Sequence, residues 1–286
     1  RLTQAQHDDS TVQMTYDSLS RVLTEVQGGN PLGTTGKTVS YAWDAEGNRT
    51  QVAYPSGFEA NETRDELGRL TQIEDGASAT VASFEVYGAG LREKKRTLAN
   101  GTCAATSYDG FRRPTAIDHK TSGGTEFAGF DYGWDKNDNP LYEARSHTSG
   151  KGDVYSYDKA NRSTRVLRDV DDPAAEVASP GTEAYVTKLE YDMDDVINLT
   201  AFKTTPYGGS TTSTSFTTNA MNEYTAVGGV THTYTDAGSL SDDGTKLYEY
   251  DAHEHLIAVR SKSTNAVIAT YSYDALGLGR RIGKVV

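Results

Sequence analysis

Residues 41–49 read Tyr-Ala-Trp-Asp-Ala-Glu-Gly-Asn-Arg, and this aromatic-x-aromatic-Asp-x-x-Gly pattern recurs roughly every 20 to 25 residues along the chain. Such self-similarity is the signature of a repeat architecture, in which each unit packs against its neighbours. Further copies lie at Tyr16-Asp17, Asp65 to Gly68, Tyr87-Gly88, Tyr108-Asp109, Trp134-Asp135, Tyr157-Asp158, Tyr191-Asp192, Asn219 to Asn222, Tyr234 to Gly238, Tyr250-Asp251 and Tyr273-Asp274. About twelve copies predict one continuous repeat array over residues 1–286.

Each copy is expected to form a β-hairpin. Upstream of the Asp, apolar or aromatic side chains alternate with polar ones, as in Val39, Tyr41 and Trp43, which is the period of a β-strand. The Asp-x-x-Gly segment is typical of a type I turn, in which the Asp side chain accepts backbone N–H bonds. About twenty-four strands would form a sheet that must curl. The predicted fold class is all-β, an array of antiparallel β-hairpins forming a coiled ribbon, tube or shell wall.

The last turn position tests this interpretation, because the chain should adopt positive φ there. Residues that tolerate this conformation stand at most copies, namely Gly47, Gly68, Asn161, Asn222, Asp138, Asp195 and Gly277. Ser20, Arg112 and Glu254 occupy the same position without that tolerance. A side chain with a Cβ atom costs about 1–2 kcal/mol in the left-handed region. These three turns are therefore expected to be either strained or built differently.

Apolar residues on the returning strands fall three apart. The pairs are Leu23/Val26, Leu70/Ile73 and Leu256/Val259. A flat strand would point the two members of each pair to opposite faces, so the spacing predicts a β-bulge that brings both inward. Three segments interrupt the repeats and are expected to be projecting loop insertions, near residues 28–36, 169–181 and 206–215.

Composition excludes several classes of function. The net charge of −12 disfavours a nucleic-acid partner, because phosphate binding needs clustered Lys and Arg. A single cysteine, Cys103, excludes an internal disulfide framework and a Cys-rich zinc site. The sequence holds no apolar run of the length that a spanning helix requires, so no membrane insertion is expected.

The repeat units resemble the YD repeats of the Rhs family, which includes bacterial Rhs proteins, the C component of Tc toxins and the animal teneurins. The resemblance is carried by residues 108–114, 67–70, 219–224 and 273–277, and it extends over nearly the whole chain. It implies a hairpin spiral that forms a hollow β-shell, which in the toxin branch encloses a cleaved C-terminal effector and in teneurins carries adhesion.

The toxin branch closes its shell with a self-cleaving signature built on repeated Asp-Pro-x-Gly. Here the sole Asp-Pro, Asp172-Pro173, continues as Ala174-Ala175, so that signature is absent from this sequence. The chain is therefore expected to be an excerpt of a longer repeat protein, or to belong to a YD protein without a toxin. Its partners would be the remaining repeats of the same protein, an enclosed toxin domain, glycans, or further copies paired through strand edges.

Two groups of residues are candidate sites. The ring platforms Trp43 with Tyr41, and Trp134 with Tyr132, have the residue types that stack on sugars, although their register also favours packing between strands. His253 and His255, with His232 as a third ligand, are weak candidates for a metal site. Surface histidines are the alternative, and no cofactor is expected.

Three functions stay open from the sequence. The first is a structural YD-repeat scaffold, forming the wall of a secreted or cell-surface shell or fibre. The second is a carbohydrate-binding or adhesion module, and the third is an enzyme acting on an extracellular polymer. The sequence contains no Gly-x-Ser-x-Gly, His-Glu-x-x-His, P-loop or dinucleotide motif, which disfavours the enzyme.

Overall fold

The computed structural model describes residues 1–7, 10–29, 33–87, 92–274 and 279–286. Contacts within the chain define two compact units. Unit 1 comprises Arg1–Ala79 with Val230–Val286, and unit 2 comprises Thr80–Gly229. The fold class is the predicted one, an all-β array of antiparallel hairpins. The existence of one continuous array over residues 1–286 stays a prediction.

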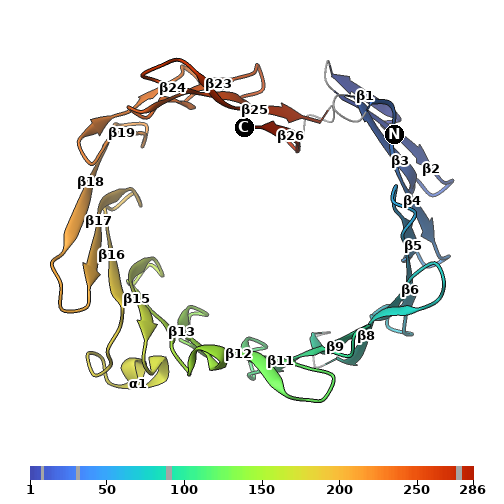
Figure 1. Ribbon diagram of the computed structural model, residues 1–286, viewed down its shortest axis with the longest axis horizontal. Helices are drawn as coiled ribbons and strands as arrows, with labels where there is room; N and C mark the ends of the chain where they lie inside the picture. Colours follow the sequence, from blue (N-terminus) through green and yellow to red (C-terminus); the bar gives the residue numbers. More distant parts are fainter. Residues whose placement is uncertain (8–9, 30–32, 88–91, 275–278) are drawn as a thin grey trace. The chain divides into compact units, whose positions relative to one another are not determined.

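Unit 1 contains two antiparallel ladders in which each strand pairs with the next one in the chain (Figure 1). The first ladder consists of β1 Gln4–His7, β2 Ser10–Tyr16, β3 Val22–Gly29, β4 Gly33–Trp43, β5 Arg49–Ala53, β6 Glu59–Arg64 and β7 Leu70–Glu74. After the short β20 Val230–Thr231, the second consists of β21 Thr233–Tyr234, β22 Leu240–Asp242, β23 Lys246–Tyr250, β24 Leu256–Ser261, β25 Val267–Tyr273 and β26 Arg281–Val285.

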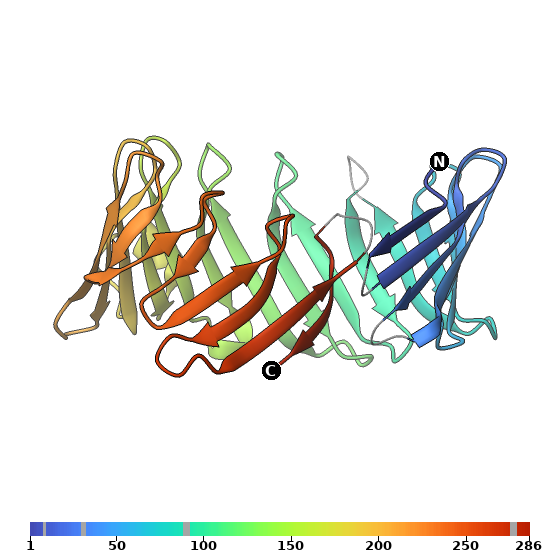
Figure 2. The same cartoon turned by 90° about the horizontal axis from the view of Figure 1, so that it is seen from above.

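Unit 2 is one ladder of the same kind, and turns join its strands at alternate edges (Figure 2). Its strands are β8 Thr80–Tyr87, β9 Glu93–Leu98, β10 Cys103–Tyr108, β11 Pro114–Lys120, β12 Glu126–Trp134, β13 Pro140–Arg145, β14 Gly152–Tyr157, β15 Ser163–Val170, β16 Thr187–Met193, β17 Leu199–Pro206, β18 Thr212–Thr218 and β19 Tyr224–Val227. A 3₁₀ turn at Ser146–Thr148 and the helix α1 Pro173–Ala178 lie in its connections.

A β-bulge opens the returning strand of each aromatic-Asp hairpin, which confirms the predicted bulge. Tyr16 lies opposite Val22 while Thr15 lies opposite Thr24, so Leu23 is left without a partner across the ladder. The same shift in register occurs after Leu70: residue 64 faces residue 70, but residue 63 faces residue 72. It occurs again after Leu256, where residue 250 faces residue 256 and residue 249 faces residue 258. An extra residue at this point bends the strand and raises its twist.

The turns adopt the expected conformation, with one correction. Positive φ is found at Gly47, Gly68, Asp138, Asn161, Asn222 and Gly238, and also at Ser20, Arg112 and Glu254. The last three residues were expected to be either strained or in turns built differently. Their positive φ confirms the first alternative, a strained turn of the usual geometry. The prediction for Asp195 is wrong, because the turn spans Asp194 to Asn198 and Ile197 has the positive φ, 75°. The turn positions of the Tyr87-Gly88 and Tyr273-Asp274 copies, Gly277 included, lie outside the described residues.

Ile197 gives a direct test of this strain. A β-branched residue is disfavoured by about 1–2 kcal/mol at such φ, and its side chain is exposed, so little burial is lost on removal. Ile197→Gly is expected to stabilise unit 2 by about 0.5–1 kcal/mol after the entropy cost of glycine. Val196→Gly is the matched control, and it should destabilise by a similar amount. Urea unfolding of both variants measures the two changes in the free energy of unfolding. If both changes have the same sign, the assigned turn is wrong.

Of the three expected insertions, the first and third are shorter than their predicted ranges, and the second is longer. The described parts of 28–36 belong to β3 and β4, with residues 30–32 outside the described set. For 169–181, β15 runs to Val170, and the connection that contains α1 then extends over residues 171–186 to β16. In 206–215, only residues 207–211 separate β17 from β18.

Few side chains are fully buried. The hydrophobic cluster of unit 2 consists of Val154, Leu167 and Val170, against which Val177 of α1 and Tyr185 pack. A chain with so small a core depends heavily on the hydrogen bonds of its ladders and turns.

Candidate functional site

The most regular polar structure of the chain lies at one edge of the hairpins, at the turns that begin with Asp or Asn. We call the turns 109–113, 135–139, 158–162, 194–198 and 219–223 of unit 2 its Asp-turn edge. At Asp158, Oδ1 accepts the backbone N–H groups of Ala160 and Arg162 at 2.9 and 3.0 Å. Oδ2 accepts a hydrogen bond from Nε of Arg162 at 2.6 Å. The predicted role of the Asp, to hold backbone N–H groups, is confirmed.

The fifth residue of each turn completes this arrangement, and the sequence analysis did not identify it. Its side chain bonds to the side chain of the first turn residue; Arg and Asn at this position donate to the turn carboxylate, whereas Glu223 accepts from the Asn219 amide. The pairs are Asp17–Arg21, Asp44–Asn48, Asp65–Arg69, Asp109–Arg113, Asp135–Asn139, Asp158–Arg162, Asp194–Asn198, Asn219–Glu223 and Asp251–His255. The fifth residue is therefore a signal for locating such turns.

In unit 2 this fifth residue also reaches the next turn along the edge. Arg113 Nη1 donates to the carbonyl oxygen of Asp135 at 2.6 Å, and Asn139 Nδ2 donates to Oδ1 of Asn161 at 2.8 Å. The series continues with Arg162 Nη1 to the Asp194 carbonyl at 2.8 Å, and with Asn198 Nδ2 to Asn222 Oδ1 at 2.9 Å. These bonds form an unbroken chain over five turns, which we call the turn ladder.

Unit 1 repeats the motif at its first hairpins. Arg21 Nη1 donates to the Asp44 carbonyl at 2.6 Å, and its guanidinium lies over the ring of Trp43 at 5.7 Å. Arg113 is placed in the same way over Trp134 in unit 2, at 5.6 Å. Each such Arg thus joins one turn to the next and covers an aromatic face, which a Lys could not do with the same geometry.

The hydrogen bonds of the turns lower the pKa of their carboxyl groups. For Asp158, the backbone N–H of Arg162 and then its guanidinium favour the ionised form and hold the pKa below the ordinary 3.8. The pKa is also lowered at Asp17, Asp44, Asp65, Asp109, Asp135, Asp194 and Asp251.

This predicts that the fold loses stability in acid. Because the folded pKa values lie below the unfolded ones, the unfolded chain binds more protons, and the stabilisation present above pH 3.8 is lost as pH falls through the folded values. We expect the urea midpoint to drop steeply between about pH 4.5 and pH 2. Asp158→Asn should make the drop shallower, whereas Asp195→Asn, an exposed neighbouring turn residue, should not. A flat profile would contradict the assigned bonds.

The aromatic residue before the turn Asp also donates a hydrogen bond to the backbone. Its N–H or O–H donates to the carbonyl that begins the returning strand of the preceding hairpin, as in Trp43 to Val22 at 2.8 Å and Trp134 to Pro114 at 2.7 Å. Tyr250 and Tyr273 do the same at Leu240 and Leu256. This bond falls beside the bulge, where the ladder is interrupted.

The four residues expected to bind sugar therefore lie within strand packing. Trp43, Tyr41, Trp134 and Tyr132 are partly buried, and the Tyr132 and Trp134 rings are tilted with their centroids 6.5 Å apart. Arg21 and Arg113 lie over the two indoles. Sugar binding by these rings stays a prediction, to be tested by loss of glycan binding in Trp43→Ala and Trp134→Ala.

The histidines occupy the turn between β23 and β24. The rings of His253 and His255 lie 6.0 Å apart, and His255 stacks on Tyr273 at 4.6 Å with Nδ1 3.1 Å from Oδ2 of Asp251. His255 thus takes the fifth position of the turn, the place of Arg elsewhere. Among the described residues, no group of three or more His, Cys, Asp or Glu is arranged to hold a metal ion, so His232 does not join them.

No helix of the described chain has the length and apolarity to cross a membrane.

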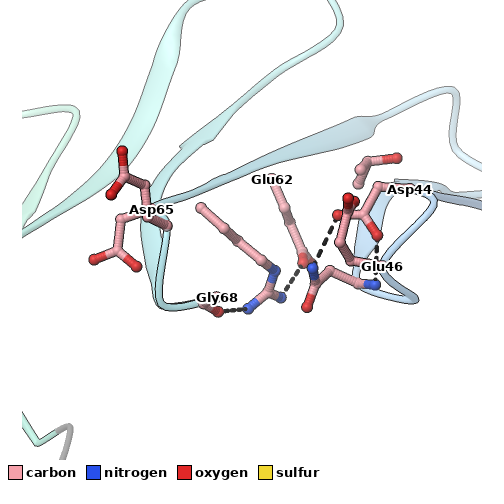
Figure 3. Close-up of a pocket in the computed structure, with 9 residues that line it drawn as sticks. Asp44, Glu46, Glu62, Asp65 and Gly68 are labelled. Carbon is pink, nitrogen blue, oxygen red and sulfur yellow. Dashed lines mark hydrogen bonds and ion pairs between the residues drawn. The ribbon is translucent and has the colours of Figure 1, made fainter.

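A cavity of about 590 Å³ lies in unit 1 between the turns that follow β4 and β6. Its acidic lining includes Asp44, Glu46, Glu62 and Asp65 (Figure 3). Glu62 is almost fully buried, and Arg64 donates to it at 2.8 Å and to the Gly68 carbonyl at 3.1 Å. Arg64 thus ties Glu62 of its own strand to the turn that follows β6.

Comparisons with known proteins agree with the repeat fold. No family model matches the chain. Over 101 residues it is 37% identical to the tRNA nuclease WapA of Bacillus subtilis (strain 168) and, likewise, to the tRNA3(Ser)-specific nuclease WapA of Bacillus spizizenii. These matches cover 35% of this chain and 4% of each relative.

Solved structures match over almost the whole chain. The TcdB2-TccC3-Cdc42 crystal structure has a TM-score of 0.73 at 15% identity, covering 99% of this chain and 16% of that one. TcdB2-TccC3 without its hypervariable C-terminal region has a TM-score of 0.65 at 13% identity, covering 94% of this chain and 16% of that one. The predicted resemblance to the YD-repeat shells of the Rhs family is confirmed at the level of fold.

Proposed function

We propose that this YD-repeat chain is a section of the wall of a secreted or surface-displayed shell, built with further repeats of the same protein around an enclosed toxin domain. The observation that carries the proposal is the turn ladder. It joins five successive turns of unit 2 along one edge, through side chains that also hold the carboxylate of their own turn. Such bonds suit a structure whose task is to hold its curvature and resist opening.

The character of the pocket in unit 1 supports the same function. A ligand-binding module or enzyme needs a pocket with a few polar groups left free to converge on a substrate. The pocket of about 590 Å³ in unit 1 is instead open and acidic, and its Asn48 and Arg64 side chains are bound to Asp44, Glu62 and the Gly68 carbonyl. The likeness to TcdB2-TccC3 also supports a shell, since this chain corresponds to 16% of that much longer one. Glycan binding and action on a polymer stay predictions.

Protease protection in the full natural protein tests the proposal. The native protein would be treated with trypsin, and the fate of the sequence beyond the YD repeats followed by mass spectrometry. A shell predicts that this sequence survives until urea opens the wall, and that it is then cut. Equal digestion of native and urea-treated protein would contradict enclosure.

A further inference from the structure

Neighbouring Asp turns are joined by a bond from the fifth residue, and the form of this bond depends on the residue that stands there. Arg donates to the carbonyl oxygen that begins the next turn, as Arg113 does to Asp135. Asn donates instead to an Asn at the positive-φ position of the next turn, as Asn139 does to Asn161. An Asn at the fifth position therefore needs an Asn partner in the following turn.

The junction between the turns 44–48 and 65–69 of unit 1 lacks this bond. Its fifth residue is Asn48, whose side chain donates to Asp44 of its own turn at 2.9 Å. Gly68 stands at the positive-φ position of the next turn, with φ 73° and no side chain that could accept. A Cβ atom at Gly68 would lie 3.7 Å from Oδ1 of Asn48. The two positions are thus close enough for the bond, and the acceptor is missing.

The aromatic bond to the preceding hairpin is missing at the same junction. Arg64 stands where Trp43 and Trp134 stand in other copies. Its guanidinium bonds within its own hairpin, to Glu62 at 2.8 Å and to the Gly68 carbonyl at 3.1 Å. Its Nε atom is buried without a partner. Each of the other junctions described inside the two units keeps at least one of these two bonds.

The acidic cavity of about 590 Å³ lies at this junction (Figure 3). Carboxylates of both turns line it, Asp44 and Glu46 from the first and Asp65 and Glu66 from the second. Like charges on two facing turns disfavour their approach. The backbone pairing of β5 with β6 ends at residues 51 and 61, before the cavity begins.

An ion pair crosses the junction beyond the paired residues. Arg49 of β5 donates from Nε to Oε1 of Glu62 on β6 at 3.0 Å. The Glu62 side chain is 6% exposed, but that of Arg49 is 42% exposed. Because water competes for a cation that is so exposed, this pair replaces the two missing bonds only in part.

We propose that this junction is the joint of unit 1, the place at which its first ladder opens before its other junctions do. Turns 44–48 and 65–69 move apart there, the Arg49–Glu62 pair breaks, and the pairing of β5 with β6 is then lost. Local opening of this kind occurs where a structure has the fewest cooperative bonds. The proposal concerns the local stability of one ladder, so it holds whether or not the wall encloses a toxin.

Protection against hydrogen exchange, measured amide by amide with NMR on the 286-residue chain, tests the proposal. The amides that join β5 to β6 lie within residues 51–53 and 59–61, and those that join β3 to β4 lie within residues 24–27 and 37–40. The first set should be at least about tenfold less protected, because two hydrogen bonds are absent beside it. Equal protection of the two sets would overturn the proposal.

Gly68→Asn supplies the acceptor that Asn48 lacks, and Asn tolerates positive φ. It should raise the protection of the β5–β6 amides about fivefold, as one added hydrogen bond would. Gly47→Asn is the matched control, since it makes the same change at positive φ in the preceding turn, where Arg21 already reaches Asp44. It should leave this protection unchanged. If both substitutions raise it equally, or if neither does, the joint is not where we place it.

Two further variants change the junction in opposite directions. Arg64→Trp introduces the ring that Trp43 provides in the preceding copy, and it should raise the protection of the β5–β6 amides about fivefold. Glu62→Gln weakens the ion pair with Arg49 and should lower this protection about fivefold, while the β3–β4 amides keep theirs. A decrease with Arg64→Trp, or no decrease with Glu62→Gln, would contradict the proposal.

Discussion

Gly152→Ala is expected to unfold much of unit 2 at room temperature, with a loss of at least about 3 kcal/mol. Gly152 begins β14 and faces Ala144 on one side and Val170 on the other. A Cβ atom there would lie 1.8 Å from the carbonyl oxygen of Glu143 and 2.8 Å from Cα of Ala144. Both obstacles are backbone, so neither can turn aside as a side chain could.

Gly110→Ala is the matched control for this substitution. Gly110 lies in a turn of the same unit, and a Cβ atom there would meet nothing within 4 Å. Its replacement should be neutral or stabilise by up to about 1 kcal/mol through the unfolded state. Urea unfolding followed by the fluorescence of Trp134 compares the two variants. Equal midpoints would show that β13 and β14 do not approach as closely as described.

Asp153→Ala is expected to cost about 2–3 kcal/mol, because it removes a buried carboxylate that binds two guanidinium groups and a backbone N–H. The Asp153 side chain is 2% exposed and receives Arg145 Nη2 at 2.6 Å and Arg168 Nη1 at 3.0 Å. Its Oδ1 also accepts the backbone N–H of Asp169 at 3.1 Å, where the pairing of β14 with β15 is irregular. The carboxylate thus replaces backbone bonds that the irregularity removes.

Asp171→Ala is the control for a charge of the same type in the same unit. Asp171 and its partner Lys151 are both about half exposed, and such a pair contributes at most about 1 kcal/mol. Asp153→Asn should fall between the two, since it keeps an acceptor for Asp169 but loses the charge. If Asp153→Ala and Asp171→Ala unfold at the same urea concentration, the buried role of Asp153 is wrong.

Local patterns predicted the hairpins well because the forces involved act within a few residues. The alternation before Trp43, the N–H-binding role of Asp17 and the bulge at Leu23 all depend on one hairpin alone. The turn ladder could not be predicted in this way, because Arg162 meets Asp194 only after a connection containing α1 has intervened. That contact depends on which strands become neighbours.

The misplaced turn at Tyr191-Asp192 shows where such prediction fails. Tyr191 and Asp192 match the repeat better than Met193 and Asp194 do, yet the turn begins at Asp194. The structure gives the physical reason. Asn198, four residues after Asp194, donates to its Oδ2 at 3.0 Å, whereas Val196 stands at the corresponding place after Asp192 and can donate no side-chain bond. A search for Arg, Asn or His at the fifth position would have located the turn.

Cryo-electron microscopy of the full natural protein is the most direct test of the central claim, that these hairpins form one section of a shell wall. The account predicts that residues 1–286 follow one another as hairpins in a wall, with the sequence beyond the repeats inside it. Hairpins that instead stand as a separate module, with solvent on both faces and nothing enclosed, would contradict it.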